Sequence, residues 1–166
     1  MPEGRFRVLR ASTRAVDGMH LLDADLELKF SEEALEAIEN GVPMSIVIEM
    51  EVLRERAIWD EQVEGLRTEL RVENHPLTTL YVIRNVNTGV ARTFRTQATM
   101  IEALSAVRSL PIVPNASLEP GERYRLRVRV RLDIEALPAP LRPLAYLSSP
   151  WRLRSEWHTQ SLHSEP

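Results

Sequence analysis

The most unusual chemistry in this sequence is a row of five arginines at alternate positions within residues 123–131. The residues between them are aromatic or aliphatic, and a period of two places successive side chains on opposite faces of a β-strand. The pattern therefore predicts a half-buried strand with an arginine outer face. Arginines spaced about 6.8 Å apart would cover roughly 27 Å, which could bind phosphates or an anionic polymer.

Acidic neighbouring strands offer another explanation for this arginine face. The net charge is -3, from 21 basic and 24 acidic residues, which argues against nucleic acid as a partner. Three acidic stripes have the matching outward parity: Asp23, Asp25 and Glu27; Glu49 and Glu51; Glu69 and Glu73. We therefore expect cross-strand ion pairs. The alternative hypothesis is an anionic-ligand site made by Arg125, Arg127 and Arg129.

The three tryptophans are further candidates for binding. Trp151 and Trp157 follow a proline-rich stretch at residues 137–144 and flank two arginines, a composition enriched at binding hot spots. The expectation we favour is that both rings close the core. Trp59 precedes Asp60 and Glu61, and we interpret this trio as an exposed loop tip. It makes a poor acid/base pair, because adjacent strand residues point to opposite sides.

Other chemistry is sparse in the sequence. The absence of cysteine excludes disulfides, thiolate zinc sites and cysteine nucleophiles, and the four histidines lack metal-site spacing. No nucleophile elbow, P-loop or glycine-rich dinucleotide turn is present. We therefore expect no metal and no cofactor, and an enzyme is the less favoured class. A hydrolase with a loop-built site stays open, because catalytic triads assemble from distant residues.

Strand patterns dominate the chain that must position these residues. Asp17-Gly18 predicts a hairpin turn between two strand-like runs. Residues 42–52 alternate except at Val47, which predicts a strand covered on both faces at its middle. The parity then changes, which indicates a bulge near Val52-Leu53. Residues 65–96 are typical of a three-strand meander.

Two short helices, a last short strand and a frayed tail complete the expected elements. Ser31 is a plausible N-cap for the first helix, and Asn40-Gly41 ends it. Thr99 and Glu102 have capping-box spacing for a second helix that Pro111 ends. Residues 151–157 predict a last short strand, and residues 157–166 a frayed tail.

Together these patterns predict a mainly β protein. We expect an antiparallel β-sandwich of about eight strands with two short helices, formed by residues 1–166 as a single domain. No segment has the length of a membrane span, and the first 20 residues lack the apolar centre of a signal peptide.

Several stretches together resemble a known family. They include Pro43-Met-Ser-Ile-Val-Ile-Glu-Met-Glu-Val52, Trp59-Asp-Glu61, residues 70–82, residues 94–104, Leu118-Glu-Pro-Gly-Glu-Arg-Tyr124 with its arginine strand, Leu137-Pro-Ala-Pro-Leu141, and Trp151-Arg-Leu-Arg-Ser-Glu-Trp157. This pattern resembles a family of small proteobacterial proteins known only as a domain of unknown function. Members usually carry an export signal, and their genes often lie near a ribosomal-RNA methyltransferase and a membrane sensor kinase of the nitrogen-regulation type.

The resemblance implies an exported, periplasmic protein whose leader is absent from this sequence, and a cytoplasmic location is the alternative. It supplies no catalytic residues. Our leading hypothesis is a non-catalytic envelope interaction domain with a protein partner, specifically the ectodomain of a sensor kinase. Trp59, Trp151, Trp157 and the proline-rich stretch would form the contact surface.

Overall fold

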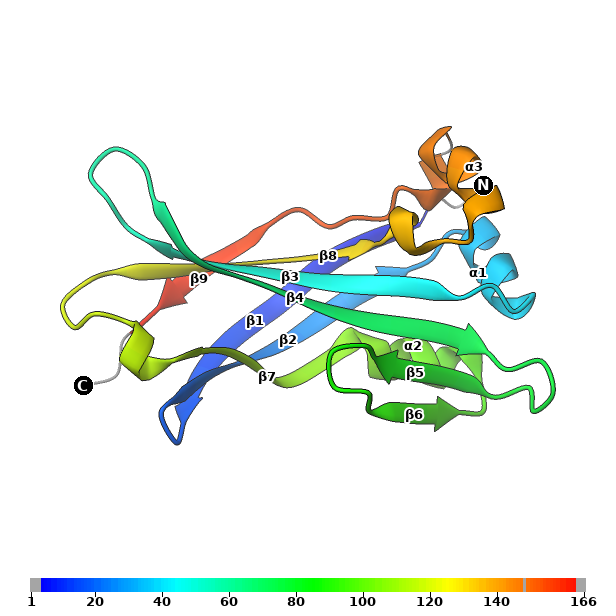
Figure 1. Cartoon of the computed structure of the whole chain (residues 1–166), viewed down its shortest axis with the longest axis horizontal. Helices are drawn as coiled ribbons and strands as arrows, with labels where there is room; N and C mark the ends of the chain where they lie inside the picture. Colours follow the sequence, from blue (N-terminus) through cyan, green and yellow to red (C-terminus); the bar gives the residue numbers. More distant parts are fainter. Residues whose placement is uncertain (1–3, 148, 164–166) are drawn as a thin grey trace.

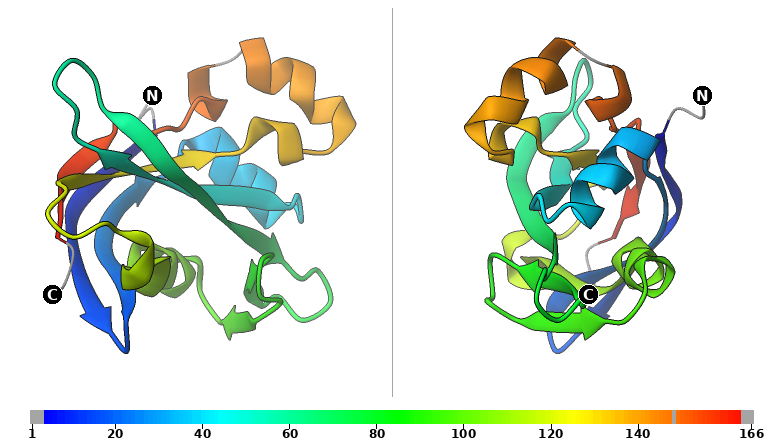
Figure 2. Two further views of the ribbon diagram at one scale, coloured as in Figure 1. Left: turned by 60° about the vertical axis from the view of Figure 1, so that its left-hand side comes forward. Right: turned by 90° about the vertical axis from the view of Figure 1, so that its right-hand side faces the viewer.

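Two antiparallel sheets form the protein in a computed structural model that describes residues 4–147 and 149–163 (Figures 1 and 2). Within these residues the strands are β1 (Arg5–Val16), β2 (Met19–Lys29), β3 (Met44–Arg54), β4 (Glu61–Asn74), β5 (Tyr81–Asn85), β6 (Ala91–Phe94), β7 (Ala106–Pro114), β8 (Tyr124–Leu132) and β9 (His158–Leu162). The helices are α1 (Glu32–Glu39), α2 (Gln97–Ser105) and α3 (Arg142–Leu147). This architecture confirms the predicted mainly β antiparallel sandwich.

The two sheets differ in size and meet through their apolar faces. The smaller sheet has the order β1-β2-β7, and the larger one has the order β6-β5-β4-β3-β8-β9. Alternate residues of β2, β3 and β8 point into one shared core, which includes Leu22, Ile46, Met50 and Val128. The apolar side of each alternating pattern therefore lies between the sheets, and the charged side faces outward.

Several local predictions are confirmed. The β1–β2 turn has positive φ at Asp17 (49°) and Gly18 (76°), as the hairpin dipeptide requires. The register of β3 against β4 shifts between Val52 and Leu53, at the predicted bulge. Val47 is fully buried although it lies on the outer face of β3. Strands β4, β5 and β6 form the expected meander.

The helices agree with the sequence in part. The hydroxyl of Ser31 accepts a hydrogen bond from the Ala34 amide at 3.2 Å, which caps α1 as predicted. The N-cap of α2 is Thr96 and not Thr99, whose own amide donates to the Thr96 hydroxyl at 3.1 Å. Within the described residues, no helix is long and apolar enough to cross a bilayer.

Strand β7 corrects the prediction that a helix continues to Pro111. The helix ends at Ser105, and Ala106 already has extended backbone angles. Val107 and Leu110 have helical spacing, which explains the error, but both lie in a strand that pairs with β2. β7 is an edge strand, so its prolines interrupt no ladder on the open side. The three prolines of residues 137–144 favour extended backbone, but this stretch instead forms a short 3-10 turn (Ala139–Leu141) and the first residues of α3.

The end of the chain is more ordered than expected. Residues 158–162 form β9, which pairs with β8, so the prediction of a frayed tail over residues 157–166 is wrong for this segment; residues 164–166 lie outside the described residues. The strand predicted at residues 151–157 makes a single bridge, between Arg154 and Arg131. The Leu162 side chain belongs to the core.

Leu162 provides a test of this corrected end. Its side chain is 1% exposed, so Leu162→Ala should lower the free energy of unfolding by about 2–4 kcal/mol through lost burial and an unfilled cavity. Urea unfolding followed by circular dichroism measures the change. The exposed neighbour His163 is the control, and His163→Ala should alter stability by less than about 0.5 kcal/mol. If both substitutions change the free energy of unfolding by the same small amount, the structured end is contradicted and the frayed-tail prediction is supported.

Candidate binding surface

Arginines of β8 lie directly opposite glutamates of β3 on the outer face of the larger sheet. Glu49 is the cross-strand partner of Arg129, and Glu51 is the partner of Arg127. Arg129 Nη2 lies 2.7 Å from Glu49 Oε2, and Arg127 Nε donates to Glu51 Oε2 at 3.0 Å. We call these residues, with Arg131, the charge ladder. The predicted pairing of the arginine strand is thereby confirmed, with the β3 glutamates as its direct partners.

The charge ladder continues into a network at one end of β8. Arg131 pairs with Glu49 and, at 3.3 Å, with Asp133, which is itself buried. Arg67 of β4 reaches the second oxygen of Asp133 at 2.9 Å and Glu69 at 3.2 Å. The predicted acidic stripe on β2 does not reach β8; it pairs within its own sheet, where Arg14 of β1 contacts Asp23 at 2.9 Å. Each sheet therefore neutralises its own outer face.

The arginines around Glu49 keep this carboxylate ionised. Burial acts to raise the pKa of Glu49, but hydrogen bonds from Arg131 and Arg129 outweigh it, so the pKa lies below its usual value. The guanidinium charges of Arg127 and Arg129 are thus already compensated by carboxylates. The anionic-ligand hypothesis loses its main physical support, because a phosphate would have to displace these partners.

Trp157 lies on the charge ladder rather than in the core. The centroid of its ring lies 4.3 Å from the guanidinium carbon of Arg127 and 4.2 Å from the guanidinium carbon of Arg129. These distances are typical of cation–π contacts. The prediction that this ring closes the core is wrong. Between the Arg131–Arg154 bridge and the Val128–His158 pair the register shifts by one residue, which moves Trp157 to the outer face.

Trp59 is at the tip of the β3–β4 hairpin, which extends beyond the sheet at the upper left of Figure 1. Its side chain is 73% exposed, and the adjacent Ile58 is 84% exposed. Ion pairs hold the base of this loop: Arg125 contacts Glu55 at 2.9 Å and Asp60 at 3.6 Å. The expected exposed tip is confirmed.

A further ion pair adds to this base. Arg56 contacts Glu61 at 2.8 Å, so the two residues that flank the loop are joined. Two large apolar side chains therefore project from a loop that is charge-paired on both sides. We call Ile58 and Trp59 the apolar tip.

Trp151 lies apart from the other two tryptophans. It packs against the core, as expected, and lines a cavity of about 410 Å³ between the end of β8 and the following segments. Arg131 also lines this cavity, so it links Trp151 to the charge ladder. The six predicted site residues thus lie near β8 or at the hairpin beside it, and their role in binding stays a prediction.

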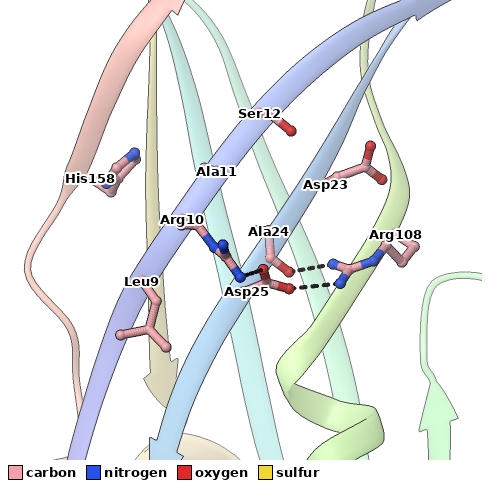
Figure 3. Close-up of a pocket in the computed structure, with 9 residues that line it drawn as sticks. All are labelled: Leu9, Arg10, Ala11, Ser12, Asp23, Ala24, Asp25, Arg108 and His158. Atoms are coloured by element: carbon pink, nitrogen blue, oxygen red, sulfur yellow. Dashed lines mark hydrogen bonds and ion pairs between the residues drawn. The ribbon is translucent and has the colours of Figure 1, made fainter.

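A second hollow, on the smaller sheet, contains acidic residues that could in principle act as catalysts (Figure 3). Arg108 and Arg10 both contact Asp25, at 2.7 Å and 3.0 Å. The hydrogen bond from Arg108 lowers the pKa of Asp25, and that from Arg14 lowers the pKa of Asp23. Both carboxyls therefore stay ionised at neutral pH, which does not suit a general acid.

Metal ligands are similarly dispersed. In the part of the chain that the structure describes, no three histidine or acidic side chains converge to hold a metal ion. His20 is buried against Asn115, with 3.0 Å between its Nε2 and the amide oxygen, and not against a serine.

Comparison with models of known protein families assigns this chain to a family. The model of the family described as Domain of unknown function (DUF4390) matches residues 3–161. The chain belongs to this family. Comparisons with curated proteins and with solved structures gave no match. The DUF4390 match supports the predicted resemblance to a family of unknown function, and it adds no residue roles to the geometry described above.

Two features of this DUF4390 member were missed from the sequence. The sequence analysis predicts exposure of Trp59 and not of Ile58, although the run Ala57-Ile58-Trp59 within a charged loop is a visible apolar signal. The stacking of Trp157 on Arg127 and Arg129 depends on a register shift between segments far apart in sequence. No local pattern indicates such a shift.

Glu49 allows a test of the charge ladder. Glu49→Gln removes the charge that Arg129 and Arg131 share, and we expect the free energy of unfolding at pH 7 to fall by about 1–3 kcal/mol. The pKa of Glu49 is lower in the folded protein, so its contribution is present above the unfolded pKa of about 4.3 and is lost as the pH falls through the folded pKa. Urea unfolding between pH 7 and pH 3 should therefore give stability curves that converge on the acid side.

Glu64 supplies the matched control. It is exposed on β4, so Glu64→Gln should leave stability within about 0.5 kcal/mol of the wild type at every pH. Parallel curves for Glu49→Gln and the wild type would contradict an ionised, stabilising Glu49.

Proposed function

We propose that this protein is a non-catalytic interaction domain of the cell envelope that binds a protein partner through the apolar tip of its β3–β4 hairpin. The observation that carries the proposal is the exposure of two adjacent large side chains, Ile58 at 84% and Trp59 at 73%. Tryptophan is strongly enriched among the residues that dominate binding energy at protein interfaces. Isolated exposed apolar residues are common, but a paired set at a projecting tip indicates an interface.

The base of the hairpin supports this function. Ion pairs of Arg125 and Arg56 with the loop's acidic residues restrain the tip before any partner arrives. A restrained loop loses less conformational entropy on binding, so more of the contact energy appears as affinity. The charged residues that surround Trp59 would form the polar rim of the contact.

The mixture of charges around the tip favours a protein over a membrane surface. Arg54 and Arg56 are accompanied by Glu55, Asp60 and Glu61. Anionic bilayers attract segments with a surplus of lysine and arginine. In this loop the acidic residues outnumber the arginines, so there is no such surplus. A partner surface with an apolar pocket bordered by both charge signs would complement it.

The specific partner we propose is the periplasmic domain of a membrane sensor kinase. This choice rests on the family resemblance, whose members are usually exported and often encoded near such a kinase. The same resemblance supports an envelope location. Trp157 and the cavity beside Trp151 would extend the contact along β8 in a large interface.

A binding measurement tests the apolar tip. Biolayer interferometry with the purified periplasmic domain of the organism's nitrogen-regulation-type sensor kinase should give saturable binding. Trp59→Ala should weaken this binding by at least about tenfold, and Ile58→Ala by a smaller factor, because a hot-spot side chain contributes about 2 kcal/mol or more.

Leu77 is the control for nonspecific apolar contact. It is 89% exposed in the β4–β5 loop, at the other end of β4 from the tip. Leu77→Ala should leave the affinity unchanged. Absence of binding, or equal losses for Trp59→Ala and Leu77→Ala, would contradict the proposal.

The envelope location is tested separately. When the chromosomal gene carries a C-terminal epitope tag, the protein should appear in the periplasmic or membrane fraction after osmotic shock, while a cytosolic marker stays behind. Recovery only with the cytosolic marker would contradict export, and it would leave the binding test of the hairpin intact.

A further inference from the structure

An apolar cleft opens between the two sheets, away from the hairpin tip. Its walls are the inner faces of β3, β4 and β5 on one side, and α2 and β7 on the other. The cleft has a volume of about 350 Å³. This value falls at the lower end of the range of roughly 300–1,000 Å³ that is usual for small-molecule sites.

The lining of this cleft is mostly aliphatic because each wall contributes the buried side of an alternating or amphipathic pattern. The main apolar residues are Ile48, Leu70, Ile83, Leu104, Val107 and Leu110. Four of them are buried, and Leu70 and Leu110 are partly buried against the core. The cleft is therefore a continuation of the core that β7 and α2 leave unfilled.

The cleft exists because β7 is the edge of its sheet. β7 pairs with β2 on one side only, while the larger sheet continues past it through β4, β5 and β6. Helix α2 packs against β5 and β6 and covers part of the exposed inner face. Its buried residues are Met100 and Leu104, and the face that remains uncovered forms the floor of the cleft.

One cation at the mouth of the cleft is available to a ligand. Arg92 of β6 is the cross-strand partner of the buried Ile83, so both lie on the inner face, and Arg92 lines the cleft. Its guanidinium carbon lies 5.2 Å from the Phe94 ring, and the residue is exposed. Among the described residues it forms no salt bridge. Arg108, the other arginine at the cleft, is already held by Asp25 at 2.7 Å.

We propose that this cleft binds a single-chain anionic amphiphile, with the aliphatic chain among Ile48, Ile83 and Leu104 and the head group at Arg92. The occupant follows from charge complementarity: an apolar cavity of this size with one free guanidinium at its mouth matches a carboxylate or sulfate on an alkyl chain. Thr68, Asn85 and Thr88 add hydrogen-bonding groups to the lining, but apolar side chains outnumber the polar ones, so a wholly polar metabolite would leave most of the cleft wall unmatched.

A chain-length series tests this proposal on the unmodified protein. Isothermal titration calorimetry with sodium hexanoate, octanoate and decanoate, each below its critical micelle concentration, should show one saturable site. Each buried methylene contributes about 0.8 kcal/mol, so the affinity should rise about fourfold per methylene until the cleft is full. Decyltrimethylammonium, with the opposite charge on the same chain, should bind more weakly than decanoate.

Substitutions at the mouth and in the wall locate the site. Arg92→Gln should weaken decanoate about three- to tenfold and leave the affinity for 1-decanol unchanged. Arg84→Gln is the matched control, because Arg84 is exposed on the opposite face of the adjacent strand β5 and should bind decanoate like the wild type. Ala103→Trp places a large ring in the cleft and should reduce decanoate binding by at least about tenfold.

The outcomes are decisive in either direction. Saturable binding that grows with chain length and falls in Arg92→Gln but not in Arg84→Gln supports the proposal. Absence of saturable decanoate binding, an affinity independent of chain length, or equal affinities of the two arginine variants would overturn it. Binding to phosphatidylglycerol vesicles without binding of monomeric decanoate would also overturn it. If Ala103→Trp does not fold, the chain-length series and the arginine variants still distinguish these outcomes.

Discussion

The pairing of β3 with β8 is the interaction on which the rest of this structure depends. Glu49 and Glu51 lie opposite Arg129 and Arg127, and this register exists only when the apolar faces of both strands also point inward. A slip by one residue would bury the four arginines of β8 and expose its core side. The apolar pattern and the charge pattern therefore specify the same register. This agreement makes the centre of the larger sheet strongly determined by its sequence.

The charge ladder also explains why Val47 can be buried on the outer face. Its cross-strand neighbours are Arg131 and Glu69, which belong to the ion-pair network over β3. Long charged side chains cover apolar surface with their aliphatic parts while their charges stay paired. Because the arginines serve this structural purpose, the candidate functions move to parts of the surface that the network leaves unused: the apolar tip and the inter-sheet cleft.

Features set by local sequence were predictable, and features set by long-range pairing were not. The alternation of β8, the Asp17-Gly18 hairpin and the bulge after Val52 follow from residue types within a few positions of each other. β7 escaped prediction because its apolar residues continue the helical spacing of α2, and only its pairing with β2 makes it a strand. Trp59 was correctly placed at a tip by its charged neighbours. The outward position of Trp157 depends on a register shift, and the cleft depends on how far β7 and α2 extend across β4, β5 and β6.

The two proposed sites lie at different points along the same pair of strands, β3 and β4, and this separation makes their functions separable. β4 begins at Glu61, beside the apolar tip, and reaches the cleft at Thr68. At about 3.3 Å per residue, this segment separates the two sites by roughly 23 Å. β4 pairs with β3 along this segment, and the ladder is interrupted only at the bulge near Val52-Leu53, close to the tip. A rigid spacer of this kind transmits little change between its ends unless it has a second stable arrangement. A ligand in the cleft should therefore fill a cavity in the core without repositioning Trp59, and the protein would hold its ligand and its partner as independent events.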